Sequence, residues 1–306
     1  QPILGSLFSE VTLADGTTKP IATQVASNLD PMYVDEFIIG YSQRFGGYTA
    51  GVTATYRDLG RAIDDIAIDS ALQQYCEQAG GGLSAASCAG VWSGFHQYVL
   101  ANPGEDVTVT LAGSDLAAAS GGLITQDRVV DLAADDLRFP KPVREYKAVE
   151  FSLERAFDGV WGGRVSYVWS DLEGNYEGAL KSDNGQADPG LTQDYDVPGL
   201  ADGAFGKLPN HREHAFKAYG NWQVTPNFNI GANILIESPR QFGCQGVHPE
   251  TDPNTDDDLF AAFYGAASWY CDLDGDGTSE ATPRGSVFKS DWLKVVDLTF
   301  AYTLRD

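Results

Sequence analysis

"FKAYGNWQVTPNFNIGANILI", residues 216–236, decides the fold class of this chain. Two runs of alternating apolar and polar residues flank the short turn 225–227. A period of two residues is the pattern of a β-strand, and so short a connection predicts an antiparallel hairpin. One face of the hairpin is apolar, with Phe216, Ala218, Gly220, Trp222 and Val224 on the first strand and Phe228, Ile230, Ala232, Ile234 and Ile236 on the second. The other face is rich in amides, including Asn221, Gln223, Asn227, Asn229 and Asn233.

The same alternation recurs along the chain and predicts seven long strands in all. They cover about 32–45, 48–59, 144–157, 164–173, 213–224, 227–239 and 291–305. Strands in soluble sheets usually have about five or six residues, whereas about 9–11 residues cross a bilayer at a tilt. The lengths therefore favour an all-β protein whose strands span a membrane.

The connections between these strands alternate between short and long. The short turns lie at 46–47, 158–163 and 225–227, and the long polar segments at 60–143, 174–210 and 240–290. In an antiparallel meander, successive connections fall at opposite ends of the strands, so every short turn lies at one end. Outer-membrane barrels have this asymmetry, with short periplasmic turns and long extracellular loops. The sequence thus predicts part of an antiparallel transmembrane β-barrel.

Aromatic residues gather near both ends of the predicted strands. Those near the short turns are Phe45, Tyr48, Phe157, Trp161, Trp222 and Phe228, and those near the long loops are Tyr33, Tyr56, Trp169 and Trp292. Two aromatic bands are typical of membrane interfaces. We therefore expect lipid against the apolar face and a water-filled or plugged lumen against the amide-rich face.

A soluble β-sandwich would show the same alternation, with its apolar face packed on a second sheet. The two interpretations differ in what covers one set of residues. Burial of Phe37, Phe151, Ile230 and Phe300 under another layer of the same protein would exclude the membrane interpretation.

Composition excludes several classes of protein. The 306 residues can form one large domain or two smaller ones. A formal net charge of −23 disfavours nucleic-acid binding, which needs basic patches. No stretch approaches the roughly 18 consecutive apolar residues of a membrane-spanning helix. No nucleophile, zinc-protease, phosphate-loop or dinucleotide motif stands in a suitable context, so we expect no enzyme and name no catalytic residue.

Four cysteines fall into two pairs that are local in sequence, Cys76 with Cys88 and Cys244 with Cys271. Each pair lies in a polar, glycine-rich region, and none has the spacing of a zinc site. We expect two loop disulfides, which implies an oxidising compartment. The alternative is four free thiols.

"DLDGDGTSE" places carboxylates at alternate positions, Asp272, Asp274 and Asp276, with Glu280 beyond them. Spaced carboxylates followed by glycine resemble the first half of a calcium loop. The closing position holds Pro283 instead of a bidentate glutamate. The stretch 272–280 is therefore either a calcium site or a solvated acidic turn.

Two further expectations concern the long loops. Apolar spacing at Ile63, Ile66, Leu72 and Tyr75 predicts a surface helix, and the composition of 174–210 predicts a mobile loop. A group of loop aromatics can either stack on a ligand or form a small loop core beside the disulfide, and we favour the core; the group is Phe263, Tyr264, Trp269 and Tyr270.

Several stretches resemble TonB-dependent outer-membrane receptors of the Oar-like group. Three of them are "SPRQFGCQGVHPETDP" (238–253), "DDLFAAFYGAASWYC" (257–271) and "TPRGSVFKSDWLKVVDLTFAYTL" (282–304), whose pieces "CQGVHP", "SWYC" and "PRGS" are the most specific. Others are "NLDPMYVDEFIIGYSQRF" (28–45), "YTAGVTATYRDLGRAIDDI" (48–66) and "LPNHREHAFKAYGNWQVTPN" (208–227). The resemblance implies a 22-stranded barrel with a plug in its lumen. It also implies capture and import of a scarce nutrient at the bacterial outer membrane, driven through TonB.

The chain contains no recognisable plug domain and no TonB box, so we expect residues 1–306 to be a single partial barrel domain of a longer receptor. The expected partners are outer-membrane lipid, an unidentified nutrient, and the TonB complex acting through the missing plug. Two other functions stay open. One is a surface adhesion or secretion-related outer-membrane protein of the Oar-like group, and the other is a soluble secreted β-sandwich.

Overall fold

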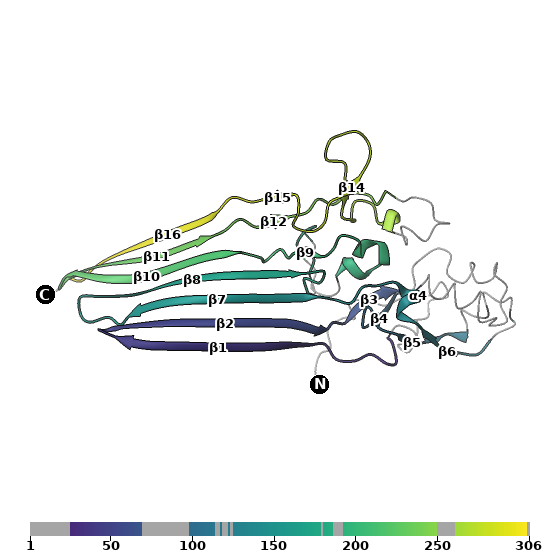
Figure 1. The fold of residues 1–306 in the computed structure, drawn as a ribbon, viewed down its shortest axis with the longest axis horizontal. Helices are drawn as coiled ribbons and strands as arrows, with labels where there is room; N and C mark the ends of the chain where they lie inside the picture. Colours follow the sequence, from purple (N-terminus) through teal and green to yellow (C-terminus); the bar gives the residue numbers. More distant parts are fainter. Residues whose placement is uncertain are drawn as a thin grey trace.

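Seven long antiparallel strands form one sheet in the computed structural model (Figure 1). The structure describes residues 25–68, 98–113, 117, 122, 125–178, 180–185, 192–249 and 261–304. The sheet order is β1 (Tyr33–Phe45), β2 (Tyr48–Arg61), β7 (Arg144–Arg155), β8 (Trp161–Gly174), β10 (His214–Thr225), β11 (Phe228–Glu237) and β16 (Leu293–Tyr302). The short strand β9 (Gly206–Lys207) pairs antiparallel with the end of β8. Every long strand is bonded to the next one along the chain, which makes the sheet a meander.

The predicted all-β class and antiparallel sheet are confirmed. The observed strand ends lie within three residues of the expected ones. The largest difference at a strand start is in β8, which begins at Trp161 instead of residue 164. The glycines Gly162 and Gly163 favour a turn in the sequence, but here they pair with Asn221 and Gly220 of β10. Tertiary pairing overrides the local preference of glycine.

The register places the alternating apolar residues that the sequence assigns to one face on the same side of all seven strands. Phe151 lies between Val52 and Tyr167, and Ile230 lies between Trp222 and Phe300. Because neighbouring strands keep the same parity, the apolar residues form continuous cross-strand rows. The result is one broad apolar face.

This apolar face is not the inside of a sandwich in the part of the chain that the structure describes. Phe37, Phe151 and Phe300 expose 63, 53 and 63% of their surface. Ile230 is half-buried, among its own sheet neighbours. The described residues supply no second layer over the sheet, and Figure 1 shows the long strands as a single sheet. No second layer buries these four residues in the described part of the chain, so the membrane interpretation is not excluded.

The opposite face carries charged and amide side chains. Arg164 lies 3.0 Å from Glu150 and 3.7 Å from Glu154 across β7 and β8. Asn233 Nδ2 donates to Asp297 Oδ2 at 3.5 Å. Polar groups at this density match a surface in contact with water or with a polar partner.

The long connections fold into a layer of small elements at one end of the sheet, on the right of Figure 1, and we call this layer the loop cap. It contains β3 (Asp64–Ala67) paired with β4 (Tyr98–Ala101), β5 (Val107–Leu111) paired with β6 (Arg128–Leu132), α4 (Ala134–Leu137), η2 (Gln193–Tyr195), η3 (Pro198–Ala201), β12 (Gln241–Phe242) paired with β15 (Phe288–Lys289), η4 (Ala261–Tyr264), and β13 (Tyr270–Cys271) paired with β14 (Glu280–Ala281). None of the helices described here is long and apolar enough to cross a membrane.

The hydrophobic core of the described chain lies in this loop cap rather than in the sheet. Ile66, Val99 and Tyr195 are completely buried in one cluster, and Val197 and Leu200 in a second. Burial of such side chains contributes about 1.5–3 kcal/mol each. The loop cap is therefore a packed structure with its own stability.

Two loop expectations are wrong where they can be checked. The helix expected from Ile63 to Tyr75 begins instead as strand β3, in which Asp64 and Ile66 are buried. Its outer part, with Leu72 and Tyr75, lies outside the described residues. The segment expected to be mobile, 174–210, buries Asp194, Tyr195 and Leu200 completely in its described part, which excludes 179 and 186–191. Long-range packing, which local spacing does not record, decided both cases.

Candidate functional site

A cluster of buried charges joins two of the long connections, and we call it the buried ion network. It consists of Lys181, Asp183 and Asp194 from the connection 174–210 and of Arg240 and Arg284 from the connection 240–290. Lys181, Asp194 and Arg284 have fully buried side chains. The network therefore fixes the two connections to each other.

Asp194 lies at the centre of the buried ion network. Its Oδ1 is 2.6 Å from Lys181 Nζ, and its Oδ2 accepts a hydrogen bond from Arg284 Nη2. Burial alone would raise the pKa of this carboxyl. The charges of Lys181 and Arg284 have the opposite and larger effect, so the pKa of Asp194 is below its ordinary value. Asp194 is thus ionised and balances two buried cations. Arg284 Nε also lies 3.1 Å from Asp183 Oδ2.

Trp269 lies against both cations of this network. Its ring centroid is 5.4 Å from Lys181 Nζ and 4.8 Å from Arg284 Cζ, and the side chain is 1% exposed. The backbone passes so close that a Cβ at Gly243 would meet the ring at 2.5 Å. Such a buried indole cannot offer a face to a ligand. For Trp269 the loop-core interpretation therefore fits better than ligand stacking.

The remaining loop aromatics are divided between packing and partial exposure. Tyr264 packs against the second hydrophobic cluster. Tyr270 is half-buried and meets the ring of His248 edge-on at 4.8 Å. The side chain of Phe263 lies outside the described residues.

Cys244 and Cys271 form the expected disulfide, with their Cα atoms 5.9 Å apart. The bond closes a loop that contains Trp269, and Asp272, the first residue of the acidic turn, follows Cys271 directly. Cys76 and Cys88 lie outside the described residues, so their pairing stays a prediction. The Cys244–Cys271 bond fits an oxidising compartment.

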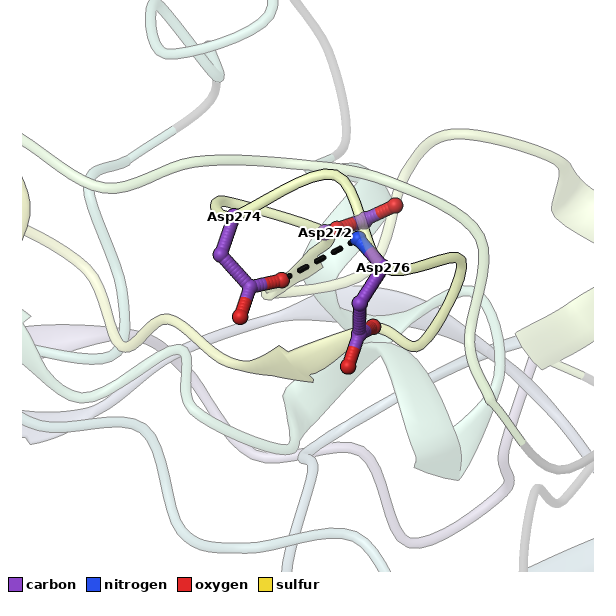
Figure 2. A group of neighbouring side chains, drawn as sticks. All are labelled: Asp272, Asp274 and Asp276. Atoms are coloured by element: carbon purple, nitrogen blue, oxygen red, sulfur yellow. Dashed lines mark hydrogen bonds between the residues drawn. The ribbon is translucent and has the colours of Figure 1, made fainter.

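Asp272, Asp274 and Asp276 converge on one exposed turn (Figure 2). One oxygen from each lies within 4.8 Å of the others. Asp272 already accepts the N–H groups of Gly275 at 2.6 Å and Gly277 at 2.9 Å. Glu280 Oε2 accepts the Leu273 N–H at 3.4 Å. Three of the four predicted ligands therefore converge, whereas Glu280 accepts a backbone N–H of the same turn and is not part of the group.

Calcium binding at this turn stays a prediction. Because the carboxylates are exposed and the closing ligand is missing, we expect a dissociation constant of about 1 mM or weaker. Calorimetric titration of the oxidised protein should show saturable heat that the Asp274→Asn variant loses. An Asp135→Asn variant, which changes an exposed carboxyl elsewhere in the loop cap, serves as the control. No saturable heat up to about 10 mM calcium would leave only the solvated turn.

A second acidic group lies buried between β3 and η2. Asp64 accepts the N–H of Thr192 at 3.2 Å and that of Asp65 at 3.0 Å. Burial and the neighbouring Asp65 raise the pKa of Asp64 to about 9. Burial and Asp65 also raise the pKa of Asp196 to about 7. These carboxyls hold protons at pH values where exposed ones have lost them.

The described histidines serve packing. His211 is 2% exposed, its Nδ1 accepts the Leu172 N–H at 3.1 Å, and burial lowers its pKa. His214 stacks on Tyr167 with ring centroids 6.0 Å apart. These contacts hold the end of β8 against β10 and the residues that precede it.

One curated protein is similar in sequence to part of the chain. Over 167 residues, or 55% of the chain, the sequence is 31% identical to the TonB-dependent transporter Oar of Myxococcus xanthus. The matched region covers 14% of that protein, so this chain corresponds to a small part of its length. No protein-family model matches the chain. No solved structure matches it either.

Proposed function

We propose that this chain forms part of the barrel wall and of the extracellular loops of a TonB-dependent receptor in a bacterial outer membrane. The observation that carries the proposal is the single antiparallel sheet with an exposed apolar face. The 31% identity to a TonB-dependent transporter supports it independently of the structure.

Strand length supports the membrane as the solvent of the apolar face. Strand β10 has 12 residues. At a rise of about 3.4 Å per residue it is about 40 Å long, and a tilt of about 45° leaves about 28 Å along the membrane normal. A bilayer hydrocarbon core is about 30 Å thick, so the strand matches it.

The orientation follows from the two ends of the sheet. The short hairpin turns lie together on the left of Figure 1, and the loop cap lies on the right. In outer-membrane barrels short turns face the periplasm and long loops face the exterior. The proposal therefore puts the loop cap at the cell surface, and the disulfide fits such an oxidising environment.

The two edges of the sheet support a larger assembly. Among the described residues β1 pairs only with β2, and β16 pairs only with β11. Unpaired strand edges cannot face lipid, because their N–H and C=O groups need partners. We propose that further strands of the whole receptor close the barrel, and that its plug couples nutrient import to TonB.

A pair of arginine substitutions tests the membrane placement. Phe151 lies on the apolar face, and the adjacent Ser152 lies on the polar face. In lipid vesicles we expect Phe151→Arg to lower the free energy of unfolding by about 2–4 kcal/mol, and Ser152→Arg to cost less than about 1 kcal/mol. Guanidinium unfolding followed by tryptophan fluorescence measures both.

Equal costs for the two substitutions would contradict the proposal. So would a wild-type chain that stays monodisperse in buffer without detergent, which the soluble alternative requires. Deleting long loops from the whole receptor would separate the remaining alternative, since a transporter loses nutrient uptake and an adhesion protein loses cell attachment.

A further inference from the structure

A hollow lies on the apolar face near the short-turn end of the sheet. It has a volume of about 570 Å³ and opens between β7, β8, β10 and β11. Its floor is a cross-strand row of small residues, in which Gly163 faces Gly220 and Gly220 faces Ala232. Because two of these residues have no side chain, the otherwise continuous apolar layer is interrupted there.

Large side chains surround this floor. On the side toward the turns, Trp161 faces Trp222, and Trp222 faces Ile230. On the other side, Leu153 faces Val165. All five residues line the hollow. An occupant would therefore touch apolar groups along nearly the whole hollow.

One end of the small-residue row holds a cation. Arg155 faces Gly163 on one side and Tyr48 on the other. Its Cζ lies 4.0 Å from the ring centroid of Trp161 and 5.8 Å from that of Tyr48. An arginine on a lipid-facing surface is costly at mid-membrane but common at the interface, where aromatic rings gather.

The guanidinium of Arg155 is held in position by the β7–β8 turn. Its Nη2 donates to Asp158 Oδ2. The other oxygen of Asp158 accepts the N–H groups of Val160 at 2.9 Å and Trp161 at 3.0 Å. A guanidinium has five N–H donors, so donors remain after this ion pair. Arg155 is thus fixed beside the hollow with capacity for another anion.

We propose that the hollow binds one diacyl phospholipid from the leaflet at the short-turn end. An acyl chain lies over Gly163, Gly220 and Ala232, and the lipid phosphate accepts hydrogen bonds from Arg155. The inference rests on the proposed function, because it takes the apolar face to lie in a bilayer. The residues that line a hollow facing hydrocarbon lose van der Waals contacts unless an acyl chain fills it. The guanidinium of an arginine is well suited to bind a phosphate group.

The glycines are poor sites for testing this proposal. A Cβ at Gly163 would lie 2.7 Å from the Tyr219 carbonyl oxygen, and one at Gly220 would lie 2.9 Å from that of Gly162. Substitution there would shift the backbone. Ala232 lines the hollow and already has a Cβ, so Ala232→Leu fills the hollow without that problem. Ala54→Leu makes the same change on the same apolar face but outside the hollow.

Native mass spectrometry of the full chain, delipidated in detergent and titrated with phosphatidylglycerol, measures the site. We expect one tightly bound lipid in the wild type, and affinity about tenfold lower in Ala232→Leu, or about 1.4 kcal/mol. Ala54→Leu should bind like the wild type. Arg155→Gln should lose the preference for phosphatidylglycerol over uncharged diacylglycerol.

The outcomes separate this inference from the proposed function. Flotation of the wild-type chain with phospholipid vesicles tests the membrane placement, and its failure overturns both. If the chain floats but Ala232→Leu and Ala54→Leu bind lipid equally, only the lipid site is overturned. Unchanged lipid preference in Arg155→Gln would overturn the phosphate contact.

Discussion

Replacing Asp194 by alanine is expected to destabilise the loop cap by about 3–5 kcal/mol. The substitution removes the anion shared by Lys181 and Arg284, both of which are fully buried. Lys181 would lose its ion pair, and Arg284 would keep only Asp183. Breaking a buried ion pair costs far more than the loss of an exposed one, which is about 0–1 kcal/mol. The effect should be among the largest of any single substitution in the chain.

Hydrogen exchange of the loop cap, read as a free energy of local opening, measures this loss. Asp135→Ala is the matched control, because Asp135 is exposed in the same layer. We expect the control to change the opening free energy by less than about 0.5 kcal/mol. Similar exchange in both variants would show that the buried ion network contributes little to the stability of the loop cap.

Raising the pH is expected to weaken the packing of β3 against η2. The folded pKa of Asp64 is raised from 3.8 to about 9, and that of Asp196 from 3.8 to about 7. A raised pKa means that the folded state binds the proton more tightly than the unfolded state. Its stabilising contribution is complete below about pH 4 and is lost as the pH rises to the folded value.

The two pKa values determine how the free energy of unfolding falls with pH. Between about pH 4 and pH 7 both contribute, each with a slope of about 1.4 kcal/mol per pH unit. Of these two carboxyls, only Asp64 contributes between about pH 7 and pH 9. Asp194 has the opposite sign, since its lowered pKa removes stability only in acid. Stability should therefore decline over the neutral and mildly alkaline range.

Asp64→Asn isolates the group responsible. The amide cannot ionise, so the decline between about pH 7 and pH 9 should disappear in this variant. Hydrogen exchange at several pH values, corrected for the intrinsic exchange rate, provides the measurement, and Asp135→Asn is the control. A wild-type profile that is flat across this range would contradict the predicted titration.

The sheet could be predicted from sequence because its two faces meet different surroundings. The alternation of apolar and polar residues lies within each long strand, as in Phe216–Val224, so it can be read from a short stretch of sequence. The start of β8 could not be found this way. Gly162 and Gly163 join the strand only because β10 pairs with them.

The structure of the loop cap is harder to predict from sequence because its contacts join residues that are far apart along the chain. Asp194 and Arg284 are 90 residues apart, and neither has a local pattern that points to the other. The acidic turn at Asp272 was found because its carboxylates are close in sequence. The adjacent Asp64 and Asp65 beside Ile66 are a local sign of a buried acidic group, although the apolar spacing of this stretch predicts a helix.

The meander order of the sheet has a consequence for assembly. Every hydrogen-bonded pair of long strands is also consecutive along the chain. If the sheet forms from one end of the chain, each strand therefore pairs with the strand just before it, which is already at the edge of the sheet. The long connections can then fold outside without threading through the wall, and strand addition never requires a pair to separate. Growth can proceed one hairpin at a time, with register set by the three tight turns before distant segments arrive.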